Sequence, residues 1–78
     1  MLIAVIERDN SVSNPYFRDR YIGSPCQSFD EARELCCAHL GYNSELEIHS
    51  FIDDGTHYVE ISRETGEILK EFFVRRLS

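Results

Sequence analysis

The segment from Ser28 to Gly41 carries a complete set of helix signals. Ser28 is a good N-cap, and Glu31 three residues later completes a capping box. Asp30 and Glu31 stand in the first turn, where the helix dipole favours negative charge. Gly41 is placed to end the helix in the left-handed conformation. We therefore predict one helix over residues 29–40. Its buried stripe should comprise Phe29, Ala32, Leu35, Cys36 and Leu40.

Strand patterns flank this helix on both sides. The run 2–6 is apolar on both faces, which predicts a central strand. Residues 16–22 mix aromatic and charged side chains without a helix signal, and predict a more exposed strand paired with the first. Alternation over 46–53 and 57–61 predicts two more strands. The segment 67–74 is apolar enough to leave a helix open, but the turn before it favours a strand.

These elements predict an α+β fold in a single domain, residues 1–78. The expected order is β-β-α-β-β-β, a two-layer arrangement with a mainly antiparallel sheet and one helix packed on one face. The apolar fraction of 42% and the charged fraction of 28% are typical of a globular chain. A chain of this size buries roughly 60–65% of its unfolded surface, so its core is thin and leaves little room for a catalytic pocket.

Two turn signals set the expected strand register. Asp54-Gly55 predicts a two-residue hairpin loop, and Glu64-Thr65-Gly66 predicts a three-residue loop with its glycine in the left-handed conformation. Side chains alternate between faces, so this register places six residues on one side of the sheet. They form an aromatic row, Phe51, Tyr58 and Phe72, beside a charged row, His49, Glu60 and Lys70. The helix is expected over the other side, above Ile48, Ile52, Val59, Ile61, Leu69 and Phe73.

The two rows are the leading candidate for a partner-binding surface. Aromatic side chains bordered by polar groups are the usual anatomy of an interface. Two other interpretations stay open: the aromatic pairs simply stabilise the sheet, or a second copy of the chain covers this face.

Acidic residues offer a second candidate surface. The chain has fourteen acidic and eight basic residues, a net charge of −6. This balance disfavours binding to a phosphate backbone, which needs clustered lysine and arginine. A regular array of carboxylates can instead imitate such a backbone and occupy a basic channel; the alternative is a solvated face that keeps the protein soluble. The residues of this acidic edge are Glu45, Glu47, Asp53 and Asp54.

The chain carries no recognisable catalytic or metal motif. Cys26, Cys36 and Cys37 are odd in number and lack zinc-ligand spacing, so we expect free thiols, no metal and a cytoplasmic location. No glycine-rich phosphate loop, nucleophile elbow, EF-hand loop or metalloprotease motif is present. Residues 1–6 form no signal peptide, and no apolar run is long enough for a membrane helix. We therefore expect no enzyme activity, cofactor or membrane contact.

The segment from Ser28 to Phe73 resembles some small phage-borne anti-CRISPR proteins in its organisation. The shared elements are a serine-capped helix with an early alanine (Ser28, Ala32), an alternating strand over 46–52, and a hairpin over 58–66. The resemblance covers about half the chain. It implies a non-enzymatic inhibitor that binds a host defence complex, in some members where target or guide nucleic acid sits. It carries over no functional residue, because no family motif is matched.

We therefore expect a cytoplasmic protein-binding module, from a phage or mobile element, that sterically blocks a host defence complex of the CRISPR type. Its partner would be a protein or protein complex. The module itself would not bind nucleic acid directly, and it would be a monomer or a homodimer. The alternative is a small regulatory or structural subunit that homodimerises through its open sheet face.

Overall fold

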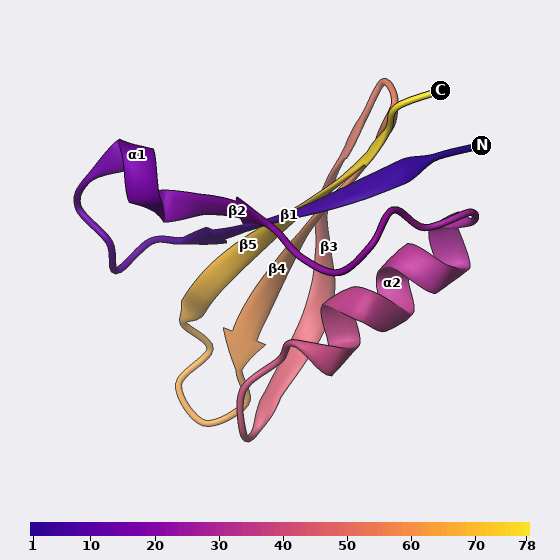
Figure 1. Cartoon of the computed structure of the whole chain (residues 1–78). Coiled ribbons are helices and arrows are strands. Elements are labelled where there is room, and N and C mark those ends of the chain that lie inside the picture. Colours follow the sequence, from indigo (N-terminus) through magenta and orange to yellow (C-terminus); the bar gives the residue numbers. More distant parts are fainter.

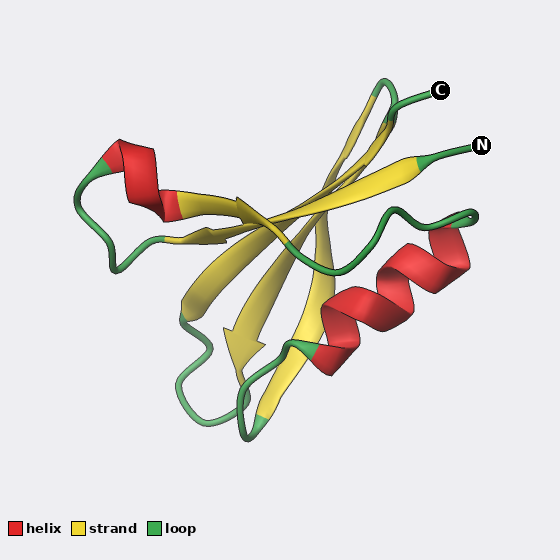
Figure 2. Ribbon diagram, viewed as in Figure 1, coloured by secondary structure: helices red, strands yellow, loops and turns green.

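The computed structural model describes residues 1–78, except for the side chain of Pro15. The elements are β1 (Ile3–Asp9), α1 (Pro15–Arg18), β2 (Asp19–Tyr21), α2 (Phe29–Ala38), β3 (Ser44–Ile52), β4 (Gly55–Ser62) and β5 (Ile68–Arg76). The five strands form one antiparallel sheet in the order β2-β1-β5-β4-β3. Helix α2 lies on one face of this sheet, and α1 stands apart at the end of the β1–β2 arm (Figures 1 and 2). The predicted α+β fold is confirmed.

The predicted capping box starts α2. The Ser28 hydroxyl oxygen accepts a hydrogen bond from the Glu31 N–H at 3.1 Å. The Glu31 carboxylate in turn accepts one from the Gln27 N–H at 2.8 Å. Two backbone donors at the helix start are thereby satisfied, which is the function of this motif.

The end of α2 differs from the prediction. The helix stops at Ala38, and Gly41 does not adopt a left-handed conformation. Asn43 does so instead, with φ of 55°. The Gly41 N–H donates a hydrogen bond of 2.9 Å to a carboxylate oxygen of Glu60, so the chain leaves the helix early to meet the sheet.

The core lies between α2 and the middle of the sheet. Of the predicted helix stripe, Ala32 and Cys36 have no exposed surface, and Leu35 and Leu40 pack at the margin. Phe29 is 40% exposed, so its predicted burial is wrong. The buried cluster comprises Ile3, Val5, Ile22, Cys26, Ala32, Cys36, Phe72 and Val74.

The predicted strand over residues 16–22 is replaced by a short helix and a short strand. The Asn14 side chain accepts a hydrogen bond from the Tyr16 N–H at 3.0 Å and caps α1. Strand β2 therefore begins only at Asp19 and is three residues long. The missed signal is the sequence Asn14-Pro15, because a capping residue before a proline also starts helices.

The β3–β4 turn lies one residue earlier than predicted. Ile52 pairs with Gly55, so Asp53 and Asp54 form the two-residue loop. Gly55 belongs to β4 and lies against β5, where an added Cβ would overlap the carbonyl oxygen of Val74. This glycine is therefore required by the close approach of two strands and not by the turn.

The β4–β5 hairpin follows the prediction more closely. Gly66 adopts the expected left-handed conformation, with φ of 74°. The segment after it is a strand, so the helix left open for this segment is not formed. Tyr58 pairs with Phe72 and Glu60 with Lys70, as predicted, and a register shift follows Glu60.

The burial of Phe72 yields a stability prediction. Phe72 is 0% exposed and Phe51 is 77% exposed. Phe72→Ala should lower the free energy of unfolding by about 3–5 kcal/mol, because it removes a buried ring and leaves a cavity. Phe51→Ala should change it by no more than about 0.5 kcal/mol. Urea denaturation of both variants measures this, and equal losses would contradict the observed position of Phe72.

Candidate functional site

The predicted rows form within β4 and β5 but face α2 instead of solvent. Phe72 is fully buried and Glu60 is 2% exposed. Tyr58 is half-buried against the core, and burial raises the pKa of its phenol. Lys70 is also largely covered. The prediction that these four residues line an exposed surface is therefore wrong.

The β3 members of the predicted rows are separated from the others. Phe51 pairs with Thr56 and not with Tyr58, because the turn lies earlier than predicted. His49 occupies a register irregularity in β3, and its ring contacts that of His57. The six predicted residues are thus not brought together.

The charged row is buried because its charges find partners. The Lys70 Nζ lies 3.5 Å from Glu60 Oε1 and 3.7 Å from Glu7 Oε2, and it donates a hydrogen bond of 3.0 Å to the His39 carbonyl. The other Glu60 oxygen accepts the Gly41 N–H.

Burying a charge is costly unless it is paired and hydrogen-bonded. Both carboxylates are paired with Lys70, and each accepts one hydrogen bond, that of Glu7 from Arg20 at 3.2 Å. Glu7 Oε2 and Glu60 Oε1 accept none from the described residues. We call Glu7, Glu60 and Lys70 the buried charge cluster.

One side chain from each strand forms a continuous row across the opposite, open face. The rings of His49 and His57 lie 4.8 Å apart, and His57 stacks on Phe73 at 4.3 Å with an interplanar angle of 10°. The Arg8 guanidinium lies 4.6 Å from the Phe73 ring centre. Arg8 then donates two hydrogen bonds, of 2.8 and 2.9 Å, to the carboxylate of Asp19. Sequence reasoning missed this open-face row, because it placed Phe73 beneath the helix.

The charged groups of the open-face row have neighbours of opposite charge within the molecule. The hydrogen bonds between Arg8 and Asp19 raise the pKa of Arg8 and lower that of Asp19. His57 Nε2 lies 2.9 Å from Glu71 Oε1, an ion-pair distance without hydrogen-bond alignment. The contact is an ion pair when the imidazole is protonated. The row thus links side chains of all five strands, and the charges of Arg8 and Asp19 are paired within the molecule. The buried His57 Nε2 lies near Glu71 but has no hydrogen-bond partner in the described part of the chain.

The acidic edge lies at the open end of the sheet. Strand β3 is the last strand in the sheet order, and the loop that follows it holds two of the four acidic residues. Glu45 lies 3.8 Å from Arg63, and Asp54 lies 3.1 Å from Arg75. Among the described side chains, no cation pairs with Glu47 or Asp53. Two of the four carboxylates of the acidic edge are therefore unpaired, and they carry its excess negative charge.

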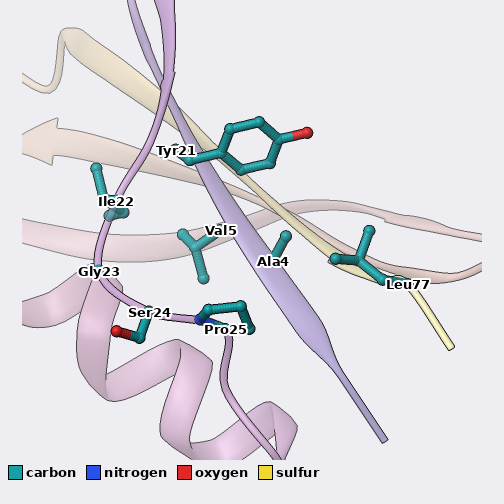
Figure 3. A pocket seen from close by; sticks show the side chains of 8 residues that line it. All are labelled: Ala4, Val5, Tyr21, Ile22, Gly23, Ser24, Pro25 and Leu77. Atoms are coloured by element: carbon teal, nitrogen blue, oxygen red, sulfur yellow. The ribbon is translucent and has the colours of Figure 1, made fainter.

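An apolar hollow of about 280 Å³ lies where β1 meets the connection from β2 to α2 (Figure 3). No carboxylate, amine, imidazole or thiol lines it. Among the described residues that line it, the Tyr21 and Ser24 hydroxyls are the only side-chain polar groups, and no lining residue supplies a base to activate either of them. Its lining comprises Ala4, Val5, Tyr21, Ile22, Gly23, Ser24, Pro25 and Leu77.

The three thiols are free and differ in exposure. Cys26 and Cys36 are buried and Cys37 is exposed. Burial raises the pKa of Cys26, and it raises the pKa of Cys36 to about 12. Within the described part of the chain, no three His, Cys, Asp or Glu side chains gather as metal ligands. The described helices include none that is long and apolar enough to span a membrane.

Comparison with known proteins identifies no relative. No family model matches the sequence, and neither curated proteins nor solved structures give a match.

The buried charge cluster yields a prediction for Lys70. Lys70→Met should lower the free energy of unfolding by about 3–5 kcal/mol, because it leaves Glu60 buried without a cation. The matched change Arg63→Met removes a cation from the exposed Glu45 and should cost at most about 1 kcal/mol. Urea denaturation at neutral pH compares the two variants. Small, equal effects would show that Lys70 does not compensate the buried carboxylates.

The thiols yield a reactivity prediction. A raised pKa lowers the fraction of reactive thiolate at neutral pH, and burial blocks the reagent as well. We expect one fast reaction per chain with a disulfide reagent at pH 8, at Cys37, while Cys26 and Cys36 react only after unfolding. Cys37→Ser should abolish the fast phase. Three equal rates would contradict the buried positions of Cys26 and Cys36.

Proposed function

We propose that this protein is a non-enzymatic binding module that docks its acidic edge on a basic surface of a partner protein complex and blocks that surface sterically. The observation that carries the proposal is the unneutralised charge of Glu47 and Asp53 on and beside a strand at the end of the sheet. Complementary charge across an interface speeds association and selects the partner.

The other surfaces support binding less well. The open-face row pairs its charges internally, and the residues of the predicted aromatic row in β4 and β5 lie under α2. The apolar hollow has no charged group to select a partner. Among these surfaces, only the acidic edge gathers exposed, unpaired carboxylates along one strand and the loop that follows it.

The chemistry of the acidic edge suggests the class of partner. Complexes that hold nucleic acid do so in positively charged channels, as CRISPR effector complexes hold their heteroduplex. Spaced carboxylates resemble a phosphate backbone in charge, so they compete for the same arginine and lysine side chains. The resemblance in organisation to anti-CRISPR proteins makes a CRISPR-type effector the first partner to test.

A phage plating experiment tests this function. The protein is expressed in strains that each carry one active type of CRISPR immunity, and in matched strains without it. We expect it to restore plating in at least one immune strain. A variant with amides at the acidic edge should not: Glu45→Gln, Glu47→Gln, Asp53→Asn and Asp54→Asn.

The matched control carries the same change in charge on other exposed acidic residues: Asp30→Asn, Glu34→Gln, Glu64→Gln and Glu67→Gln. It should restore plating as the wild type does. Equal loss in both variants would show that only net charge matters, and failure of the wild type in every strain would contradict a CRISPR-type target. Concentration-dependent sedimentation of the purified protein tests the alternative, a subunit that dimerises through its open face.

A further inference from the structure

We infer that β3 receives an extended basic segment of the partner by β-strand addition, and that this segment alternates arginine or lysine with apolar residues. The inference rests on the proposed function and specifies how the acidic edge would bind. It follows from three features of β3: its position at the edge of the sheet, its outward-pointing backbone groups, and its acidic and apolar side chains on opposite sides.

Strand β3 is the long unpaired edge of the sheet. It has nine residues, and residues 47–51 are all exposed. The opposite edge, β2, has only three residues and follows α1 directly. A long edge strand presents a row of N–H and C=O groups that another strand can pair with.

The hydrogen bonds to β4 show which β3 residues face outward. The Arg63 N–H donates to the Asn43 carbonyl at 2.9 Å. In an antiparallel pair the backbone N–H and C=O groups of successive residues point alternately toward and away from the partner strand. Those of Glu45 and Glu47 therefore also point toward β4. Leu46 and Ile48 therefore direct their N–H and C=O groups to the free side. The register irregularity after Ile48 ends this regular run.

The two sides of β3 demand different side chains from an added strand. Glu45 and Glu47 pair with Ile61 and Val59, on the open side of the sheet. Leu46 packs against the core, on the α2 side, and Ile48 follows on that side with 56% exposure. Directly opposed residues on neighbouring strands interact most strongly. An added strand would thus place basic side chains beside the two glutamates and apolar ones beside Leu46 and Ile48.

A second copy of this chain fits the edge less well than a basic segment does. It would bring the same acidic residues beside Glu45, Glu47, Asp53 and Asp54. Like charges on facing strands are destabilising, and edge charges are a common defence against self-pairing. The charge of the edge therefore selects a basic occupant.

A peptide titration tests the inference with the full chain. The probe is a capped seven-residue peptide that alternates arginine and valine, added to ¹⁵N-labelled protein. We expect saturable shifts of the Leu46 and Ile48 amide signals and weaker binding as salt is added. The same peptide with glutamate in place of arginine should not bind.

Two N-methylated forms of the peptide separate strand addition from charge attraction. Each is methylated at alternate residues, so only one form loses the N–H groups that face β3. We expect one form to lose about tenfold or more in affinity and the other to bind normally. Equal binding by both forms, or shifts spread over all acidic surfaces, would overturn the inference.

Variants of the protein give an independent test. Ile48→Pro removes an outward N–H and should weaken peptide binding about tenfold, because proline is tolerated at an edge but cannot donate. Ile48→Ala keeps the N–H and should change affinity less. If Ile48→Pro does not fold, the affinities of the two methylated peptides for the wild-type protein test strand addition instead. A dimer of the wild-type protein that Ile48→Ala retains and Ile48→Pro abolishes would assign the edge to a second copy and overturn the inference.

The outcomes also separate this inference from the proposed function. Restored plating by both the wild type and Ile48→Pro, with no peptide binding, would overturn strand addition and leave the blocking function. If only one of the two methylated peptides loses affinity, but the protein restores plating in no strain, strand addition is supported and a CRISPR-type target is contradicted.

Discussion

The contact of Lys70 with two buried carboxylates determines how the layers of this fold are joined. Glu7 comes from β1, Glu60 from β4 and Lys70 from β5, so one cation joins three strands. The same groups hold the chain that leaves α2, through the His39 carbonyl and the Gly41 N–H. Because these buried charges need those backbone partners, α2 must end on this side of the sheet. His57 and Phe73 consequently face the open side and complete a row across all five strands.

Local signals in the sequence predict the elements well and the covered face poorly. The capping box at Ser28 and the left-handed Gly66 depend on neighbouring residues, and both are observed as predicted. Adjacent Phe72 and Phe73 give both faces of β5 similar apolar character, so periodicity cannot decide which one is buried. The choice depends on the partners that Lys70 finds in β1 and in the α2–β3 connection. These are contacts between distant segments, which no sequence window contains.

In the candidate site, too, some features follow from local sequence and others from contacts between distant segments. Composition alone singles out the acidic residues around β3, but their position at an edge depends on β5 lying between β1 and β4. The Asp54-Gly55 pair predicts a turn because such dipeptides favour tight hairpins. Gly55 is instead required within β4 by the Val74 carbonyl, a constraint from another strand. Because Gly55 lies in β4 and not in the turn, the observed β3 register differs from the predicted one, and Phe51 pairs with Thr56 instead of Tyr58.

The two edges of the sheet are protected by different means, and this difference argues for a binding role of β3. At the other edge, β2 is short, and the Arg8–Asp19 hydrogen bonds hold its first residue to β1. Strand β3 is long, and its protection consists of a register irregularity near His49 and of negative charge. An irregularity limits how far a strand can be paired, whereas charge discriminates by sign. Glu45 and Glu47 repel a second acidic copy and attract a basic strand, so the feature that opposes aggregation also selects the partner.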